Sequence, residues 1–389
     1  MHEDPIVIAG AARTPMGGFQ GDLSGARAPD LGAAAIKAAL TRAGIAPEAV
    51  DEVYMGIVLP AGLGQALGAG LPVAVPATTL NKMCGSGMKA AMLAHDGILA
   101  GAGAVMVAGG MESMSNAPYL LDKARGGYRM GHGAVLDHMF LDGLEDAYDK
   151  GRLMGTFAED TATHYQFTRD AQDDFALTSL ARAKTAIEDG TFDPEVTPVT
   201  VKTRKGEVTV ERDEQPLKAA PEKIRALKPA FAKDGTVTPA NSSSISDGAA
   251  ALVLMRRSDA EKRGLTPLAV IHGHASHAHE PCWFTTAPVG AMQKLADKVG
   301  WDLKDVDLFE INEAFAVVTM AAMRDLDLPH DKVNVHGGAC ALGHPIGASG
   351  ARIMVTLLAA LEKYDLRKGV ASLCIGGGEA TAVAIERIT

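Results

Sequence analysis

Short apolar runs rich in β-branched residues alternate along this chain with longer alanine-rich stretches of helical periodicity. The short runs predict strands at 5–9, 52–57, 104–108, 250–255, 268–274, 308–311 and 370–375. The longer stretches predict helices at 30–43, 87–101, 169–189, 289–299, 314–325 and 350–363. Because apolar strands alternate with helices, we expect an α/β fold whose mixed sheets are buried on both faces.

The two ends of the chain carry similar segments, which indicates an internal duplication. Residues 105–112 resemble residues 373–379, and a glycine-rich strand-to-helix turn precedes each segment. Valine-rich strands followed by glycine occur in many α/β proteins, but the matching order of elements favours duplication. The stretch between the halves is richer in charge and poorer in strands. We therefore divide the chain into a first half (1–117 and 241–266), an inserted loop domain (118–240) and a second half (267–389).

The net charge of −10 over 389 residues argues against nucleic acid as a general partner, because a phosphate backbone requires a basic surface. Residues 202–233 form a basic stretch with interleaved glutamates. Such a stretch is commonly a solvated face, and a docking site for a phosphate-bearing ligand is the alternative.

The four cysteines are widely scattered, which favours free thiols in a reducing compartment over a disulfide framework. The chain enters a strand-like run at residues 6–9 without a basic and apolar leader, and no apolar run is long enough to span a bilayer. We therefore expect a cytoplasmic protein that does not bind membranes.

Cys84 is the strongest candidate for chemistry. It lies where an extended run turns into a predicted helix, and Gly85, Ser86 and Gly87 follow it. A thiolate at a helix N-terminus is stabilised by free N–H groups and the helix dipole, so we expect a depressed pKa and a nucleophilic role. The alternative is a buried structural cysteine.

Three further residues lie in or near tight turns. His344 precedes Pro345 in a glycine-rich turn that suits a catalytic imidazole. Cys374 ends an apolar strand before three glycines, which predicts a second thiol at the sheet edge where α/β sites form. By itself, Asn312 would be interpreted as a helix N-cap. We include it among the site residues because the motifs of Cys84, His344 and Cys374 occur in the same chain.

Other patterns are weaker. Two short glycine repeats, at 62–64 and 101–103, lack the spacing of a dinucleotide loop. His272, His274, His277 and His279 gather in a strand-like stretch, but no carboxylate or thiolate stands at ligand spacing, so we expect no metal site. Cys282 and Cys340 are interpreted as packing or spare thiols.

Together these motifs resemble the thiolase family over nearly the whole chain, and most closely its acetyl-CoA C-acetyltransferase branch. The resemblance rests on segments 11–15, 81–87, 312–316, 343–345 and 374–378, which occur in the family's order. It implies two duplicated βαβαβαββ halves layered as α-β-α-β-α, with an inserted loop domain, in a homodimer or homotetramer. It also implies acetyl-CoA, acetoacetyl-CoA and coenzyme A as substrates and products, with no cofactor.

The resemblance also implies residue roles. Cys84 would carry an acetyl group, with His344 taking the thiol proton, and Cys374 would deprotonate a second acetyl-CoA to give acetoacetyl-CoA plus coenzyme A. Asn312 would hold a water at the enolate oxygen, and the backbone N–H groups of Cys84 and Gly376 would serve a second oxyanion. The implied substrate-binding residues are Met154, Ser243, Phe231, Phe284 and Phe315.

The chain departs from the family at several positions. The family segment Gly-Gln-x-Pro-Ala-Arg-Gln is shortened after Gln65, Leu153 replaces a common histidine, His336 replaces an asparagine, and Glu379 follows the triple glycine. The runner-up function is a degradative 3-ketoacyl-CoA thiolase of broader chain length. A ketoacyl synthase is disfavoured because it would have histidine at Asn312. A non-catalytic acyl-CoA- or lipid-binding protein would lack a catalytic residue, and a nicotinamide oxidoreductase would need a glycine fingerprint after the first strand.

Overall fold

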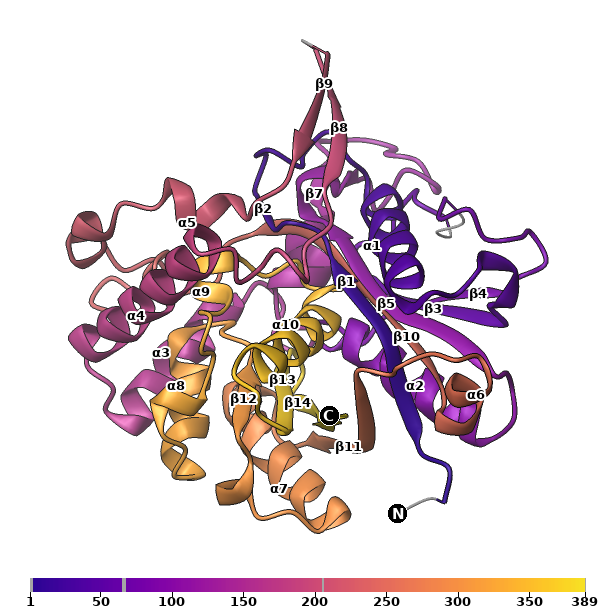
Figure 1. The fold of residues 1–389 in the computed structure, drawn as a ribbon. Coiled ribbons are helices and arrows are strands. Elements are labelled where there is room, and N and C mark those ends of the chain that lie inside the picture. The colour runs from indigo at the N-terminus through magenta and orange to yellow at the C-terminus, as the bar shows by residue number, and fades with distance from the viewer. Residues whose placement is uncertain (1–2, 65–67, 205, 389) are drawn as a thin grey trace.

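The computed structural model describes residues 3–64, 68–204 and 206–388. A single mixed sheet runs through the molecule (Figure 1). Its ten strands are β1 (Ile6–Arg13), β2 (Gly17–Gly18), β3 (Glu52–Gly56), β4 (Ala77–Leu80), β5 (Val105–Ser113), β10 (Ser246–Arg256), β11 (Ala269–Ala278), β12 (Leu308–Ile311), β13 (Lys368–Ile375) and β14 (Glu379–Arg387).

The sheet consists of two copies of one arrangement. Its strand order is β12-β13-β14-β11-β1-β10-β5-β3-β4, with β2 paired to β10. Each copy contributes four strands, counted outward from the centre of the sheet: β1-β10-β5-β3 in the first copy and β11-β14-β13-β12 in the second. In both copies the first two neighbouring pairs are antiparallel and the third pair is parallel. The expected duplication is therefore present in the fold, and β1 and β11 join the copies through two residue pairs.

Helices separate and cover the two copies in layers. Helix α1 (Ala28–Ala43) packs on one face of the first copy, and α7 (Ala287–Val299) packs on the outer face of the second. Helices α2 (Ser86–Leu99) and α10 (Ser349–Lys363) lie between the copies and pack against strands of both. The expected α-β-α-β-α layering is therefore confirmed.

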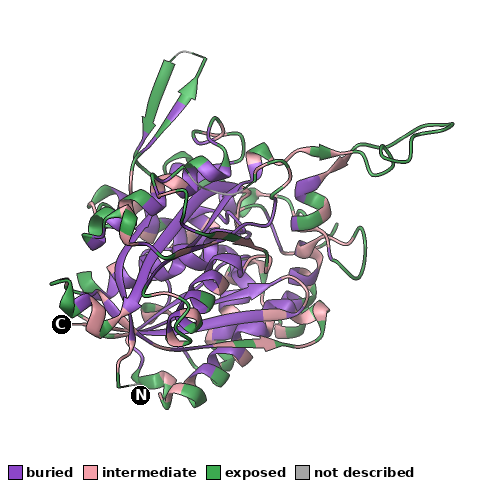
Figure 2. Cartoon of the chain, turned by 90° about the vertical axis from the view of Figure 1, so that its right-hand side faces the viewer, coloured by how far each residue is buried: buried purple, intermediate pink, exposed green. Residues whose placement is uncertain are grey.

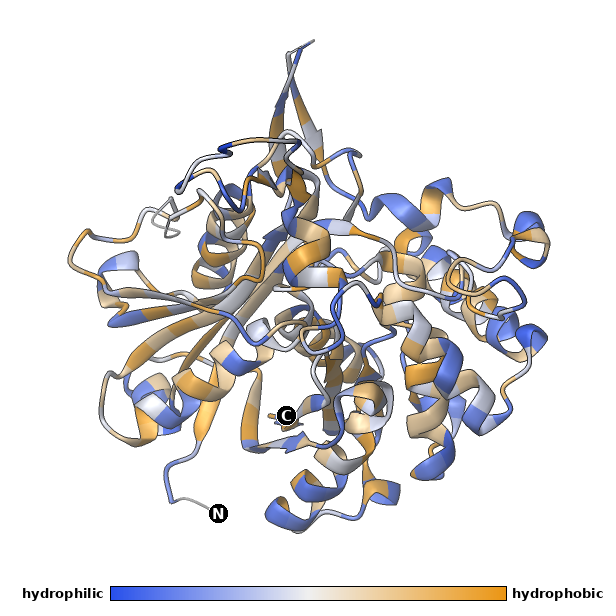
Figure 3. Ribbon diagram, turned by 180° about the vertical axis from the view of Figure 1, so that it is seen from behind, coloured by the Kyte–Doolittle hydropathy of each residue, from blue (hydrophilic) through white to orange (hydrophobic). Residues whose placement is uncertain are grey.

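The period-2 alternation of strand side chains produces these layers. In β1, Val7 packs in the cluster under α1, whereas Ile6 and Ile8 face α2 and α10. Both faces of the sheet are buried, as Figure 2 shows along the central strands. Hydrophobic residues gather on these strands and on the inner helix faces, with hydrophilic residues turned outward (Figure 3).

Residues between β5 and β10 form the inserted region. Its elements are β6 (Tyr119–Leu120), β7 (Leu136–Asp137), α3 (Met154–Tyr165), α4 (Arg169–Glu188), β8 (Val199–Thr203), β9 (Gly206–Val210) and α5 (Glu214–Lys218). The β8–β9 hairpin projects from the body (Figures 1 and 2). Buried Arg13 of β1 anchors the region through ion pairs with Glu195 and Asp213. The remaining α-helices of the described residues are α6 (Arg257–Lys262), α8 (Ala316–Asp325) and α9 (Ala339–Leu342).

The shortened segment after Gln65 falls at residues 65–67, which lie outside the described residues. Within the part of the chain that the structure describes, no helix combines the length and apolar character needed to cross a membrane.

Candidate active site

Cys84 lies in the loop between β4 and α2, held in a fixed shape by local hydrogen bonds. The buried Ser86 hydroxyl accepts from the Lys82 backbone N–H at 2.8 Å and donates to the Met83 carbonyl at 2.6 Å. Met83 has a φ of 47°, in the left-handed region that costs a side-chain-bearing residue free energy. The surrounding structure therefore holds Cys84 in a strained turn at the helix start.

Small residues bring the starts of α2 and α10 close together. A Cβ on Gly87 would lie 2.9 Å from the Ala351 nitrogen, and a Cβ on Gly350 would lie 2.5 Å from the Met88 nitrogen. Any larger residue at either position would push the helices apart. This contact brings the Cys84 loop next to the turn that carries His344.

The end of β13 supplies the second thiol and a donor. Cys374 is fully buried and packs with Phe157, Phe284 and Phe315. After Ile375 the chain turns through Gly377 and Gly378, whose φ angles of 95° and 88° favour glycine. This turn presents the Gly376 N–H to the Cys84 sulfur, which also receives its own backbone N–H.

The contacts of the His344 imidazole favour one tautomer. The Ser349 hydroxyl donates to the Pro345 carbonyl at 2.9 Å, so at 2.5 Å from His344 Nδ1 it acts as an acceptor. The proton is therefore assigned to Nδ1, which leaves a lone pair on Nε2. Asn312 Nδ2 lies 3.5 Å from the same Nδ1, at the long limit of a hydrogen bond, so the shorter contact with Ser349 decides the assignment.

Two buried polar atoms of the predicted catalytic residues have no hydrogen-bond partner among the described residues: His344 Nε2 and Asn312 Oδ1. Leaving a buried polar atom unsatisfied costs about 1–3 kcal/mol. Both belong to residues that the sequence singled out, and a bound substrate or water would satisfy them.

Burial sets the resting protonation states. Desolvation raises the pKa of Cys84 to about 11, although the N–H groups of Gly376 and Cys84 oppose the shift. The expected depression of this pKa is therefore wrong, because loss of solvation outweighs the helix-start donors. Burial, with a smaller contribution from Arg352, lowers the pKa of His344 to about 3. A neutral thiol thus faces a neutral imidazole at pH 7. Burial also holds the pKa of Cys374 well above its usual range.

A cavity of about 370 Å³ opens above these groups, and its lining is mostly apolar. The sequence-predicted residues on its wall are Cys84, Met154, Phe231, Ser243, Phe284, Phe315, His344 and Gly376. Cys374 and Asn312 are buried behind this wall. The structure therefore brings the predicted residues together around one cavity.

The individual wall contacts show how the cavity is closed. Met154 is the first residue of α3, and its sulfur would lie 3.5 Å from a Cβ built on Gly376. Phe231 meets Phe315 edge to face with ring centroids 6.0 Å apart. The Ser243 hydroxyl donates to the Ala314 carbonyl at 2.9 Å. The inserted region and the second half of the fold thus meet at the cavity.

Residues that sequence reasoning missed support the site from behind. Ser349 lies five positions after His344 and carries no motif of its own. Buried Glu112 accepts the backbone N–H groups of Val58 and Gly347, each at 2.9 Å, and burial raises its pKa to about 7. The sequence signal that could have identified Glu112 is its position in the segment 105–112, which resembles residues 373–379.

Lys82 of the Cys84 loop forms an ion pair with Glu379, which begins β14. Glu379 was noted in the sequence only as a departure from the family pattern. The pair links the loop that carries one thiol to the turn that follows the other.

The lysines and arginines of residues 202–233 do not line this cavity, and some of them form ion pairs. Lys218 contacts Glu214 and Asp22, and Arg225 contacts Asp174. A larger, open hollow of about 940 Å³ lies between the β8–β9 hairpin and residues 21–25, remote from both thiols.

Comparisons with known proteins agree with this architecture. Family models described as the thiolase N-terminal and C-terminal domains match residues 6–258 and 265–387. The chain is 49% identical over 390 residues to an acetyl-CoA acetyltransferase of Cupriavidus necator and 51% identical over 390 residues to one of Escherichia coli. Each comparison covers 98% of this chain and 99% of the relative. The crystal structure of the Bacillus anthracis acetyl-CoA acetyltransferase superimposes with a TM-score of 0.96 at 42% identity, over 99% of each chain.

Proposed function

Since the chain belongs to the thiolase family, we propose that it is an acetyl-CoA acetyltransferase that joins two acetyl-CoA molecules reversibly into acetoacetyl-CoA and coenzyme A. One observation carries the proposal. The Cys84 sulfur, two N–H donors and an imidazole with a free Nε2 lone pair meet at one apolar cavity, and a second thiol lies behind it.

The first half-reaction is acyl transfer to Cys84. Because the thiol is protonated at rest, it must lose its proton as it attacks the thioester carbonyl, and His344 Nε2 is placed to take it. The carbonyl oxygen becomes an oxyanion that the N–H groups of Cys84 and Gly376 stabilise, each such donor being worth about 2.7–4 kcal/mol. Collapse releases coenzyme A, whose sulfur takes the proton from His344.

The second half-reaction forms the carbon–carbon bond. Cys374 first loses its own proton to solvent. Its thiolate then removes a proton from the methyl group of a second acetyl-CoA, and the negative charge moves to the thioester oxygen. His344, together with a water held by Asn312, stabilises this enolate. The carbanion attacks the acetyl carbon on Cys84, and the Cys84 sulfur leaves as a thiolate that takes up a proton from solvent. The product is acetoacetyl-CoA, and the reverse sequence is thiolysis by coenzyme A.

The cavity wall supports a short acyl chain. Met154 lies next to Gly376, and the Phe231–Phe315 pair forms another part of the cavity wall. A 3-ketoacyl-CoA thiolase of broader range would need room there for several methylene groups. Comparison of thiolysis rates for acetoacetyl-CoA and for a long 3-ketoacyl-CoA tests this point, and equal rates would reject the short-chain assignment.

The central experiment separates the two thiols. We expect wild-type protein incubated with acetyl-CoA to gain one acetyl group on the peptide containing Cys84, detected by mass spectrometry. Cys84→Ala should lose this adduct. Cys374→Ser should keep it but form no acetoacetyl-CoA. Condensation at the wild-type rate in Cys374→Ser would remove Cys374 from its role, and absence of any adduct in wild type would favour a non-catalytic acyl-CoA-binding protein.

The proposal extends to the setting of the enzyme. A mechanism that uses Cys84 and Cys374 as thiols requires a reducing compartment, which supports a cytoplasmic location. We also propose that coenzyme A thioesters are the only small molecules needed, without a resident cofactor, and that the enzyme serves fatty acid metabolism as a homodimer or homotetramer. Light scattering after size-exclusion chromatography distinguishes these assemblies from a monomer.

A further inference from the structure

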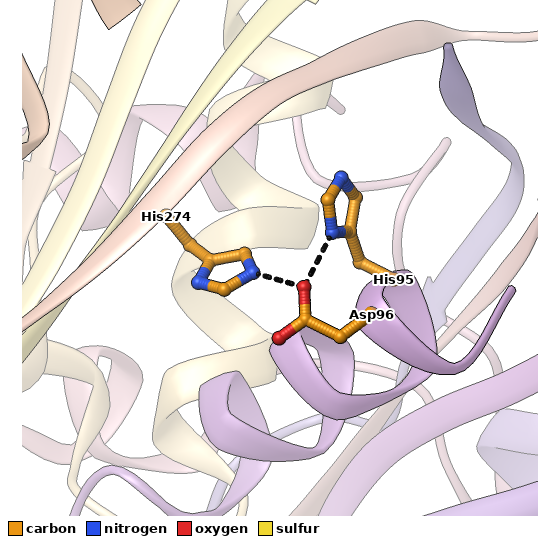
Figure 4. A group of neighbouring side chains, drawn as sticks. All are labelled: His95, Asp96 and His274. Atoms are coloured by element: carbon orange, nitrogen blue, oxygen red, sulfur yellow. Dashed lines mark hydrogen bonds and ion pairs between the residues drawn. The ribbon is translucent and has the colours of Figure 1, made fainter. Parts of the chain in front are cut away.

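His95, Asp96 and His274 form a compact cluster outside the cavity, which we call the HDH cluster (Figure 4). Asp96 Oδ1 lies 3.0 Å from His95 Nδ1 and 2.8 Å from His274 Nε2. All three ligand atoms lie within 4.8 Å of one another. The two rings stand nearly perpendicular, at 89°, with centroids 5.1 Å apart. Two imidazoles therefore converge on one carboxylate oxygen.

A β-bulge in β11 aims His274 at this position. The pairing of β11 with β14 passes from Ile271↔Ile385 to Gly273↔Ala384, which leaves His272 without a partner. Before the bulge, Ile271 faces the layer of α2 and α10. One extra residue reverses the alternation, so that His274 faces α2 after it and Ala275 faces α7.

The other histidines of β11 do not join the cluster. His272 lies 2.7 Å from Glu386 and beside the Trp301 ring, and His277 packs against His279. The sequence-based expectation of no metal site rested only on the histidines around β11 and the residues near them in the sequence. The carboxylate of Asp96 and the second imidazole, that of His95, come instead from the end of α2. Asp96 is 178 residues away from His274 in the sequence.

We propose that the HDH cluster binds a divalent transition-metal ion, with Zn²⁺ as the best match. Two imidazole nitrogens and one carboxylate oxygen are typical protein ligands of Zn²⁺, at about 2.0–2.2 Å. The Asp96 side chain is 50% exposed, so water can reach a fourth position. Mg²⁺ and Ca²⁺ prefer oxygen ligands and do not match this donor set.

The ion would lie away from the chemistry. His95 follows the first residue of α2 by nine positions, which corresponds to about 14 Å along a helix. The ligands join a helix of the first copy of the fold to a strand of the second. A bound ion would therefore act as a cross-link between the copies behind the Cys84 loop, and it would stabilise the folded chain without contacting substrate.

Calorimetric titration of EDTA-treated, desalted full-length protein with ZnCl₂ tests the proposal. We expect one ion per chain, with an affinity that falls by more than about tenfold in His274→Gln and in the nearly isosteric Asp96→Asn. His272→Gln on the same strand is the matched control and should bind as wild type does. Equal binding by wild type and both cluster variants, or no binding by wild type, would overturn the proposal.

A second measurement excludes the thiols as the binding site and checks folding. Zn²⁺ should still bind Cys84→Ala, and loss of binding there would assign the ion to the active-site thiol instead. In thermal melting, Zn²⁺ should raise the Tm of wild type and His272→Gln, because an ion that binds only the folded state stabilises it. It should leave the Tm of Asp96→Asn unchanged, and MgCl₂ should have no effect on any of them.

Discussion

Residues 105–112 and 373–379 occupy equivalent places in the two copies of the fold, yet they use their glycines differently. In the first copy, Gly109 and Gly110 stay within β5, where backbone from other strands and turns packs directly on them. In the second copy, the chain turns at Gly377 and Gly378, and Gly376 presents its N–H to the Cys84 sulfur. The first copy thus packs against the His344 turn, whereas the second copy supplies the Cys374 thiol and the Gly376 N–H donor.

The difference shows that a duplicated fold does not duplicate chemistry. Glu112 at the end of the first segment is a buried acceptor for the Gly347 N–H, next to the His344 turn. Glu379 at the end of the second is partly exposed and pairs with Lys82. The ends of the two similar segments therefore hold one site from two directions.

The largest expected effect comes from filling the packed glycine. A Cβ on Gly110 would lie 2.1 Å from the Gly347 carbonyl oxygen, and backbone cannot move aside easily. We expect Gly110→Ala to lower the free energy of unfolding by about 3 kcal/mol. In Gly376→Ala the new Cβ makes an ordinary 3.5 Å contact with Met154, so the loss should stay below about 1 kcal/mol. Denaturant unfolding measures both, and equal losses would contradict the contrast.

Loss of the hydroxyl that orients His344 should reduce turnover rather than binding. Ser349→Ala removes the acceptor for Nδ1–H and allows the other tautomer. We expect kcat to fall roughly tenfold to hundredfold with little change in KM, part of the usual contribution of a general base. Ser372→Ala, which removes another buried hydroxyl bonded to a carbonyl, is the control. Similar kinetics in the two variants would show that Ser349 has only a structural role.

The pH dependence of alkylation compares the two thiols directly. Only the thiolate reacts, and below its pKa the thiolate fraction rises about tenfold for each pH unit. With a Cys84 pKa of about 11, iodoacetamide labelling should keep rising between pH 7 and 10 instead of levelling near 8.5. Cys374, fully buried, should label more slowly throughout. Peptide mass spectrometry follows each site, and a plateau below pH 9 would contradict the raised pKa of Cys84.

The smallest expected effect concerns the ion pair between the two loops. Lys82 and Glu379 are partly exposed, and such pairs contribute about 0–1 kcal/mol. We expect Glu379→Gln and Lys82→Met each to lower the free energy of unfolding by less than about 1 kcal/mol. Their double variant should show a loss smaller than the sum if the side chains interact. Strict additivity in this double-mutant cycle would indicate that the pair contributes nothing.

Much of the fold was predictable because apolar periodicity is a local signal. The strand expected at 308–311 coincides with β12, and the helix expected at 350–363 matches α10 within one residue. The strand β14 was missed because three of its nine residues are alanine and two are glutamate, which are depleted in strands. Helix α3 was missed within the irregular insertion.

The catalytic residues of the site could be predicted from the sequence, but their pKa values could not. Glycines and proline mark Cys84, His344 and Cys374 in the sequence. The pKa of Cys84 depends instead on how closely distant segments such as the β13 end and the inserted region enclose the sulfur. The partners Ser349 and Glu112 carry ordinary sequence signals, and the HDH cluster depends on a bulge that exists only in the pairing of two strands.

The shared helix layer has a consequence for any attempt to divide the protein. Helix α2 is encoded by the first copy and α10 by the second, but each buries its apolar surface against strands of both. A fragment ending near residue 264 would expose the inner side of its sheet and most of one helix to water. We therefore expect separately expressed fragments to aggregate, and co-expression to restore solubility, because neither copy can exclude solvent from its interior alone.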